Sequence, residues 1–407
     1  MNGVAIPRWA LPASVYVASA AWVLRGSLGR SVGEGIDLPG TLWFHGFVAN
    51  CLTTLTLPTH TSAFFAPEGK DIFGDTGANV LDAVFAAPFL AAFGSAAYMA
   101  PFVAAVLVGN AVAMHRFLRS LGLSTAAVIA GSVAWAFAPS LLHELDGGRP
   151  TQAVLWFWPL ALTALIRMRD DPSWVHPILA GVFVALQAWT YWFTGHFFAV
   201  AFAPALLLWG FVGANRGRWL RRLGGAGFVA LLAVAPAAVP MALRLTHGGV
   251  SGAGLKNLPP ALDPDAWWIL APWASNLPIP TWWLVVLGAA LLGCRNRILW
   301  GTAAALGLLL VAGPRLAVSQ GSITNPVWWV ASALPGFERL LFPVRAWPVL
   351  ALCGAVALAE ALDRLRGKRW GAAGIVAAGI VLLIHATHPA PLRSTAAFVP
   401  TYVAEVA

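Results

Sequence analysis

Charged residues are scarce in this chain of 407 residues. Asp, Glu, Lys and Arg together make up 10% of the sequence, and tyrosine occurs only four times. Hydrophobic residues make up 59%, and the mean hydropathy is +0.74. A soluble globular protein, in which about 25% of residues are charged, has far more polar side chains to cover its surface. The composition therefore excludes an ordinary soluble protein and predicts an all-α, polytopic membrane protein.

Cysteine and the familiar nucleotide motifs are also scarce or lacking. Cys51, Cys294 and Cys353 lie far apart in the sequence, so no pair has the spacing of a zinc site. We find no phosphate-cradling glycine loop, no kinase motif set and no nucleophile elbow. The basic residues that give the net charge of +9 lie in short segments between apolar runs, unlike a basic nucleic-acid-binding domain. We therefore expect no ATP coupling within this chain and no nucleic-acid partner.

Apolar runs of membrane-spanning length recur along the sequence. A helix needs about 17 to 25 mostly apolar residues to cross a hydrocarbon core of about 30 Å. The sequence predicts about eleven such spans, of which the eighth and ninth are short. They centre on residues 11–27, 96–115, 124–142, 151–167, 176–193, 196–213, 224–243, 281–294, 298–313, 346–362 and 371–387.

The positions of the charges predict the topology. Cytoplasmic loops carry an excess of Lys and Arg. With a cytoplasmic N-terminus every inner loop is basic, and twelve of the sixteen acidic residues lie on the outer side. The long connections are then the outer ones, at about 28–95, 143–150, 244–280 and 314–345, and long connections are often functional. We expect one transmembrane domain over residues 1–388, with its working surface outside and a short outer tail at 389–407.

Two acids, Glu34 and Asp37, follow the first span in the stretch GEGIDLPGTLWF. A carboxylate held beside apolar walls at a membrane surface is desolvated, which suits it to accept a proton from a hydroxyl nucleophile. Both are therefore candidate catalytic residues. The alternative is a solvated loop acid or a helix N-cap, since an aspartate before a proline-containing helix start is a good cap.

A second acidic segment follows further along the same outer loop. Asp71, Asp75, Asn79 and Asp82 have the spacing of one helical face, and oxygen ligands in such an array suit Mg²⁺ or Ca²⁺. Two glycines interrupt that helix, and the ligand order is not that of an EF-hand. Asp71 and Asp75 are thus weak candidate metal ligands, with turn and capping roles as the alternative. A divalent cation is the cofactor that the sequence leaves open.

Polar residues gather again on the short outer loop LLHELDGGRPTQ, between the third and fourth spans. Such residues beside a membrane are costly unless they pair or contact something. This makes them candidate substrate-binding residues: His143, Asp146, Arg149 and Gln152.

Two arginines, Arg339 and Arg345, lie outside at the entrance to a late span, against the trend of the other basic residues. A guanidinium holds phosphate oxygens in a bidentate way, so a phosphate group is a candidate ligand for both. The alternative is that they pair with outer acids such as Glu338 or Asp37.

Together these features resemble the GT-C superfamily, polytopic membrane glycosyltransferases that use lipid-linked sugars, and in particular its bacterial branch related to YfhO. The resemblance covers nearly the whole chain through four loose motifs. These are GIDLPGTLWF, FFAPEGKDIFGDTGANVLDAVFAAPFLAAFG, AGSVAWAFAPSLLHELDGGRPTQAVLWFWPLALTAL and LPGFERLLFPVRAWPVLALCGAVALAEAL.

The resemblance implies an outer-face active site in a bacterial inner membrane, with a polyprenyl-phosphate sugar donor and an acceptor glycan, lipid or protein. Asp37 matches the motif acid expected to act as base, with Glu34 as its neighbour or substitute. Arg345, and less closely Arg339, matches basic positions near the donor phosphate. His143 and Gln152 match polar loop positions.

The resemblance also leaves differences and alternatives. Many relatives continue into a soluble outer domain, whereas this sequence ends soon after its last predicted span, and the second acid expected in the outer loops is not identified. A transporter or flippase for a lipid-linked molecule also requires polar groups near a bilayer, although usually at its midplane and within repeats. A non-catalytic GT-C-like subunit of a membrane complex is a further alternative.

Overall fold

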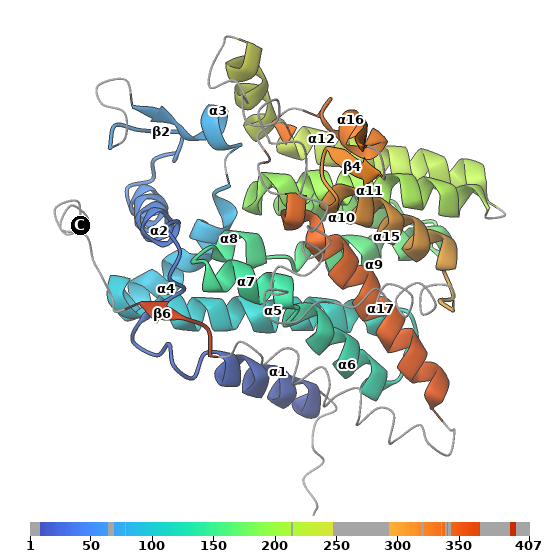
Figure 1. Cartoon of the computed structure of the whole chain (residues 1–407), viewed down its shortest axis with the longest axis horizontal. Coiled ribbons are helices and arrows are strands. Elements are labelled where there is room, and N and C mark those ends of the chain that lie inside the picture. Colours follow the sequence, from blue (N-terminus) through green and yellow to red (C-terminus); the bar gives the residue numbers. More distant parts are fainter. Residues whose placement is uncertain are drawn as a thin grey trace, which may run out of the picture. The chain divides into compact units, whose positions relative to one another are not determined.

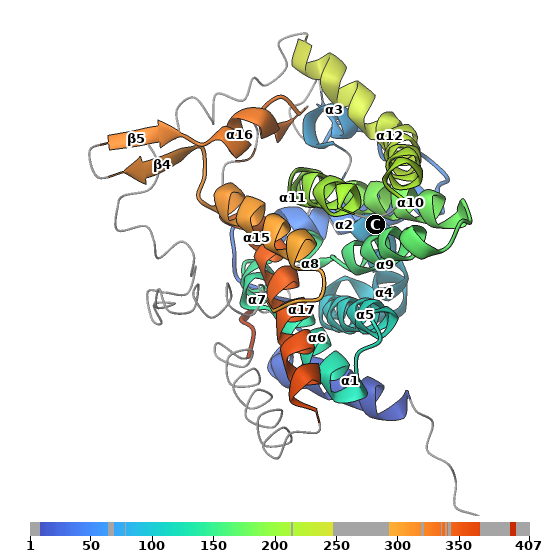
Figure 2. The same ribbon diagram turned by 90° about the vertical axis from the view of Figure 1, so that its right-hand side faces the viewer.

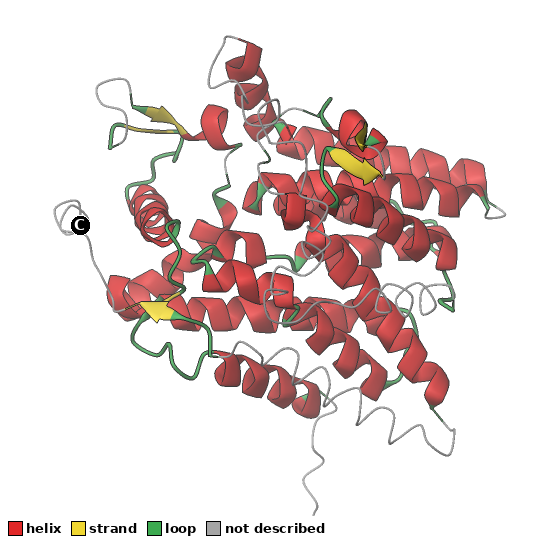
Figure 3. Cartoon of the chain, viewed as in Figure 1, coloured by secondary structure: helices red, strands yellow, loops and turns green. Residues whose placement is uncertain are grey.

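A computed structural model describes residues 9–63, 69–77, 79–212, 215–246, 293–318, 321–334, 336–337, 340, 343–366 and 391–395. Helices dominate these ranges (Figure 1), and the strands within them are two to four residues long. Coloured by secondary structure, the described chain is almost entirely helix and loop (Figure 3). The all-α, polytopic architecture predicted from the sequence is confirmed.

The chain forms two compact units. Unit 1 comprises residues 1–50, 83–156 and 358–407, and unit 2 comprises residues 51–82 and 157–357. Unit 1 contains α1 (Ala10–Val23), β1 (Ser31–Val32), most of α2 (Leu38–Thr53) and of α4 (Leu81–Ala97), α5 (Met99–Ser120), α6 (Thr125–Ala136), α7 (Pro139–Asp146), α8 (Pro150–Ala153) and β6 (Ser394–Thr395). Its core lies where α5 packs against α1 and α6.

Two breaks in the helices of unit 1 bring polar backbone near its core. Ala138 is extended because it precedes Pro139, and the proline then starts α7 without losing a needed amide. The break after α8 is satisfied by Asn110 of α5. Its amide donates to the carbonyl of Ala153 (2.7 Å) and accepts the N–H of Leu155 (3.0 Å). Because Asn110 is fully buried, these bonds replace the water that a helix break needs.

Unit 2 is built mainly from helices that pack against one another. α10 packs against both α9 and α12, and α11 packs against α15; Figure 2 shows α9 to α12 together. The elements are β2 (His60–Thr61), β3 (Lys70–Asp71), α3 (Ile72–Thr76), α9 (Phe157–Asp170), α10 (Val175–Thr190), α11 (Trp192–Phe211), α12 (Arg216–Thr246), α15 (Arg297–Val311), β4 (Arg315–Val318), β5 (Gly321–Thr324), α16 (Pro326–Ala331), η3 (Pro343–Ala346) and most of α17 (Trp347–Leu365).

A buried arginine fixes one end of the α9, α10 and α12 group. The side chain of Arg222 on α12 is 2% exposed. It donates to the carbonyls of Met168 and Asp171, each at 2.5 Å, and to that of Ser173. Arg222 thereby binds carbonyls that the end of α9 leaves without helical partners, where a cation is favoured. This arginine, which lies between the sixth and seventh predicted spans, is therefore a structural residue.

The observed helices match most of the predicted spans. Among the described residues, four helical segments are long and apolar enough to cross a membrane: Met99–Ser120, Thr125–Asp146 (α6 and α7 together), Trp192–Phe211 and Arg216–Arg244. The fifth and sixth predicted spans, 176–193 and 196–213, leave only two residues between them, and in the structure one extended residue, Tyr191, joins α10 to α11. The span predicted at 371–387, and nearly all of that at 281–294, lie outside the described residues, so the count of eleven stays a prediction.

The first outer segment, 28–95, contains two helices, α2 and α4, that were not among the predicted spans, although a helix start after Asp37 was the alternative we gave for that residue. α2 is rich in aromatic residues but interrupted by small and polar ones, and α4 contains Pro88 and a kink at Gly94. Such sequences resemble loops because glycine and proline are poor in helix interiors. Here tertiary packing compensates: His45 of α2 is buried and hydrogen-bonds the hydroxyl of Tyr98 (3.0 Å).

Candidate active site

Two glycine-containing loops of unit 1 meet at the positions selected from the sequence. Gly33 has φ +95°, and a Cβ there would lie 2.6 Å from the Cα of Gly148. The N–H of Glu34 donates to the carbonyl of Asp146 (2.9 Å). Only glycine allows this backbone conformation and approach without strain. The loop after the first predicted span and the loop between α7 and α8 therefore form one surface.

Asp37 is fixed at the start of α2 within this surface. Its carbonyl accepts the N–H of Thr41 (2.9 Å), so it occupies the N-cap position. The hydroxyl of Thr41 in turn donates to the carbonyl of Gly148 (2.9 Å), which ties the first turn of α2 to the other loop. The Asp37 carboxylate contacts Nη1 of Arg149 at 3.3 Å, and its side chain is 49% exposed within the described structure.

Arg149 joins two carboxylates. Its Nε donates to Glu144 at 2.5 Å, and its Nη1 contacts Asp37 at 3.3 Å. The side chains of Arg149 and Glu144 are 20% and 13% exposed. Burial by itself lowers the pKa of Arg149, but the charges and hydrogen bonds of Glu144 and Asp37 outweigh it and hold the pKa above its usual range. Arg149 is therefore a permanent cation beside the proposed base.

Asp146 has a separate cationic partner near the end of the chain. Its carboxylate accepts the backbone N–H of Arg393 (2.8 Å) and lies 3.3 Å from the Nε of the same residue. Nη1 of Arg393 lies 4.0 Å from the carboxylate of Glu34. The surface thus holds four acids, Glu34, Asp37, Glu144 and Asp146, and two arginines.

The remaining predicted residues of this loop flank the same surface. His143 lies on α7 and is partly buried, and its carbonyl accepts the N–H of Gly147 (2.9 Å). Gln152 lies on α8, and its side-chain oxygen is buried without a hydrogen-bond partner in the described structure. Since a buried amide oxygen normally has a donor, Gln152 is suited to receive one from a ligand. His143 and Gln152 thus lie on the two short helices that flank Arg149.

The second acidic segment does not form a cluster with metal-binding geometry. Asp71 caps α3 by accepting the N–H of Gly74 (2.9 Å), and Asp75 lies 3.3 Å from Arg244. Asn79 accepts the N–H of Trp192 (2.7 Å). Among the described residues no group of three or more His, Cys, Asp or Glu is arranged to hold a metal ion. Asp71 thus has the capping role we gave as the alternative, and a cation at Asp71 or Asp75 stays a prediction.

Arg345 belongs to unit 2, where it lies in η3 directly before α17. Its Nη1 donates to the hydroxyl of Tyr191, the residue between α10 and α11, at 3.0 Å. The ring of Trp192 packs edge-on against His196, with centroids 5.0 Å apart. These contacts place a partly buried guanidinium at one end of the α10 and α11 pair. Arg339 and Glu338 lie outside the described residues.

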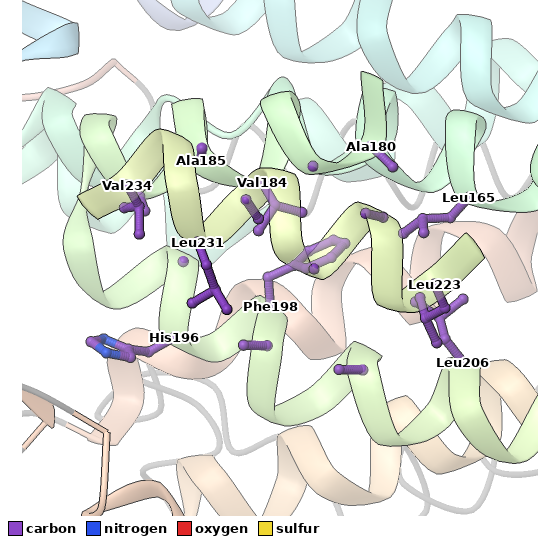
Figure 4. A pocket seen from close by; sticks show the side chains of 18 of the residues that line it. Leu165, Ala180, Val184, Ala185, His196, Phe198, Leu206, Leu223, Leu231 and Val234 are labelled. Carbon is purple, nitrogen blue, oxygen red and sulfur yellow. The ribbon is translucent and has the colours of Figure 1, made fainter. Parts of the chain in front are cut away.

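An apolar slot of about 560 Å³ begins at this end of α11. It lies among α9, α10, α11 and α12, with His196 at one end and Leu165, Leu206 and Leu223 at the other (Figure 4). Small residues, mainly alanine and glycine, form much of its wall. Among the described residues that line the slot, His196 is the one with an ionisable side chain.

The slot is long. It follows α12 from Leu220 to Ala238, a rise of about 27 Å. That rise approaches the thickness of the hydrocarbon core of a bilayer, about 30 Å, so the slot is long enough for an extended hydrocarbon chain.

Several residues that shape these sites were not found from the sequence. Glu144 was noted only as a member of the polar loop, Tyr191 only as part of a short junction, and Arg393 only as part of the tail. The signal for Arg393 was weak, because a lone arginine after the last predicted span resembles any solvated tail residue. The slot had no sequence signal, since its alanines and glycines are as typical of tightly packed membrane helices.

Three solved structures of other proteins are similar to this chain in fold. Arabinofuranosyltransferase AftD from Mycobacteria is similar with a TM-score of 0.57 and 16% identity, over 98% of this chain and 28% of that one. ArnT from Cupriavidus metallidurans, solved bound to undecaprenyl phosphate, has a TM-score of 0.53 and 15% identity, over 92% of this chain and 64% of that one. The oligosaccharyltransferase of Archaeoglobus fulgidus has a TM-score of 0.51 and 13% identity, over 94% and 55%.

No family model and no curated protein matches the sequence. In the structural comparisons the chain spans less than a third of the length of AftD and 64% of that of ArnT. It has the transmembrane fold of the GT-C glycosyltransferases, as the sequence resemblance implied, and it is a multi-pass membrane protein. The branch related to YfhO stays a prediction.

Proposed function

We propose that this protein with a GT-C fold is a membrane glycosyltransferase. It transfers a sugar from a polyprenyl-phosphate donor to an acceptor glycan, lipid or protein on the outer face of a bacterial inner membrane. The observation that carries this proposal is the long apolar slot of unit 2, which has His196 at one end, together with Arg345, which bonds to the adjoining Tyr191. An amphiphile with a long apolar chain and an anionic head fits that combination.

The isoprenoid tail of the donor occupies the slot. A long slot among membrane helices, lined almost wholly by apolar atoms, favours a hydrocarbon chain over a sugar or a nucleotide. The slot therefore supports a polyprenyl carrier as the lipid of the donor.

Arg345 binds the donor phosphate. Its guanidinium is held by the Tyr191 hydroxyl at 3.0 Å, and a guanidinium fork has the geometry to hold phosphate oxygens in a bidentate way. Trp192 and His196 follow Tyr191 closely on α11 and line the slot. The junction of α10 and α11 therefore lies beside both the proposed phosphate ligand, Arg345, and the start of the slot for the isoprenoid tail. During transfer Arg345 stabilises the negative charge that develops on the leaving phosphate.

Asp37 acts as the base in unit 1. Its carboxylate accepts the proton of the acceptor hydroxyl as that oxygen bonds to the anomeric carbon, and the bond from this carbon to the donor phosphate oxygen breaks. Glu34 is the neighbouring carboxylate, with His143 and Gln152 as proposed acceptor contacts. Asp146 pairs with Arg393, and Arg149 pairs with Glu144 and Asp37. Because these charges already have partners, we assign Asp146 and Arg149 to support of the loop rather than to contact with substrate.

The assigned base is tested by transfer of labelled sugar from a polyprenyl-phosphate donor in proteoliposomes. Asp37→Asn keeps the size of the side chain but removes its basicity, and we expect transfer to fall about 10²- to 10⁴-fold. Asp170→Asn, at an exposed acid on the other predicted side of the membrane, is the matched control and retains wild-type rates. Equal rates for Asp37→Asn and wild type contradict the assignment.

The lipid slot is tested with Ala203→Trp, which places a large side chain in the slot from α11. We expect co-purified polyprenyl phosphate, measured by mass spectrometry, to fall about tenfold. Leu208→Trp, which places the same side chain at an exposed position of the same helix, is the matched control. Unchanged polyprenyl phosphate in Ala203→Trp contradicts the assignment of the slot.

The same purified and reconstituted proteins also distinguish the two alternative functions, a transporter or flippase and a non-catalytic subunit. Movement of the lipid-linked molecule across the membrane without chemical conversion supports a transporter or flippase. Purification with a stoichiometric partner, together with full function of Asp37→Asn in cells, supports a non-catalytic subunit.

A further inference from the structure

The last described segment of the chain, residues 391–395, lies against the proposed catalytic loop. Its strand β6 pairs antiparallel with β1, so that Ser31 is opposite Thr395. The N–H of Gly33 donates to the carbonyl of Arg393 (2.7 Å), and the hydroxyl of Thr395 donates to the carbonyl of Gly33 (2.8 Å). Backbone bonds therefore continue from this segment to the residue before Glu34.

An apolar anchor and an acid hold the segment in place. Leu392 is 2% exposed and belongs to the core of unit 1, and its N–H donates to the carbonyl of Val23 (3.1 Å). Asp146 accepts the N–H of Arg393 and contacts its Nε. Because the Arg393 side chain is 67% exposed, its ion pairs alone are weak. Leu392 and the backbone bonds supply most of the attachment.

Three parts of unit 1 contact one another here: residues 391–395, the loop of Gly33 and Glu34, and Asp146. Residues 391–395 bind the Gly33 loop and Asp146, and Glu34 also bonds to the backbone of Asp146. We propose that residues 391–395 are a strap that holds the loop of Glu34 and Asp37 in its working position, with Arg393 and Asp146 as positioning residues. This inference rests on the proposed function, because the loop matters for activity only if Asp37 is the base.

Detachment of the strap is tested in the full chain, in lipid nanodiscs, with Leu392→Asp. A charge at this buried anchor disfavours docking, and we expect transfer to fall about 10- to 100-fold, mainly in kcat, because small displacements of a catalytic group have effects of that size. The KM for the donor stays near the wild-type value, since the donor site is assigned to unit 2. Leu28→Asp, at a position 78% exposed in the neighbouring loop, is the matched control.

Hydrogen exchange gives a readout that does not depend on transfer. In Leu392→Asp the amides of Gly33 and Glu34 lose the support of the strap, and we expect their exchange to be at least about tenfold faster than in wild type. Exchange at the far end of α5, in residues 110–120, stays unchanged and shows that the unit is folded. Unchanged exchange at Gly33 and Glu34 overturns the strap proposal.

A rescue experiment distinguishes positioning from a general loss of structure. Opposite residues of an antiparallel pair have Cα atoms about 4.5–5.5 Å apart, within the range that a disulfide bridges, about 4.4–6.8 Å. We introduce Ser31→Cys and Thr395→Cys into Leu392→Asp, in a background where alanine replaces the three free cysteines, Cys51, Cys294 and Cys353. Oxidation should restore slow exchange and most of the lost transfer, and reduction should remove both.

The outcomes separate this inference from the proposed function. Restored slow exchange without restored transfer, in a protein whose wild type is active, overturns the positioning role. If wild type shows no transfer at all while Leu392→Asp exchanges faster at Gly33, the proposed function fails and the strap remains as a structural element. Transfer that is equal in wild type and Leu392→Asp, despite faster exchange, also overturns the proposal.

Discussion

Replacement of Arg149 by glutamine separates two ion pairs that differ in burial. Arg149 lies 2.5 Å from Glu144, whose side chain is 13% exposed, and 3.3 Å from Asp37, whose side chain is 49% exposed. Exposed pairs contribute about 0.2–1 kcal/mol because water screens them. Removal of one partner from a buried pair costs about 3–5 kcal/mol, since a charge is left without compensation. For Glu144, mostly but not fully buried, we expect on the order of 2 kcal/mol.

A double-mutant cycle measures the two couplings. We compare Arg149→Gln with Glu144→Gln, with Asp37→Asn and with each pair combined, by reversible denaturant unfolding in detergent micelles. The coupling to Glu144 should be about 1–3 kcal/mol, and the coupling to Asp37 should be below about 1 kcal/mol. Arg116→Gln, at an exposed arginine of α5, is the control and should change stability by less than about 0.5 kcal/mol.

This design also tests the reasoning about the proposed base. If Arg149 supports the loop mainly through Glu144, Asp37 keeps a position at the surface where it can accept a proton. A coupling to Asp37 that equals or exceeds the coupling to Glu144 refutes this, because it shows that the carboxylate of Asp37 is engaged chiefly in structure.

Three further predictions follow from single contacts. Asn110→Ala leaves the carbonyl of Ala153 and the N–H of Leu155 without their buried partner, so the free energy of unfolding should fall by about 1–3 kcal/mol, seen as a lower melting temperature. Gly33→Ala should destabilise by about 2 kcal/mol or more, because φ there is +95°, while Gly40→Ala, with open space around it, should be neutral or stabilising. Tyr191→Phe removes the hydroxyl that holds Arg345, and the KM for the donor should rise about 2- to 10-fold in transfer assays, whereas an unchanged KM would show that Arg345 needs no such support.

Much of the fold follows from the sequence because apolar run length is a direct physical signal. In a bilayer the backbone must satisfy its own hydrogen bonds, so a long apolar run becomes a helix whatever its neighbours are. This is why α5, α11 and α12 lie where spans were predicted. α2 and α4 were not among the predicted spans because their glycine, proline and polar residues weaken that signal, and contacts such as His45 with Tyr98 are invisible in a linear sequence.

The candidate site could be predicted in part, for a similar reason. Asp37 and the loop from His143 to Gln152 stood out because polar residues are rare in this chain. Their meeting in unit 1, through Glu34 and Asp146, could not be inferred, since it depends on a close approach of two glycine-containing loops more than a hundred residues apart. The partners of the charges, such as Arg393 for Asp146, depend on the same approach.

The sequence by itself determined the environment of this protein, its helical class and the side on which its rare charges are predicted to gather. These properties follow from composition and run length, which local physics converts into structure. The tertiary structure alone decided which charges pair, that the end of the described chain docks beside Glu34, and that four helices leave a long apolar slot between them. Such features depend on contacts between distant segments, and small side chains such as alanine and glycine fill a helix interface or leave it open according to how the helices pack.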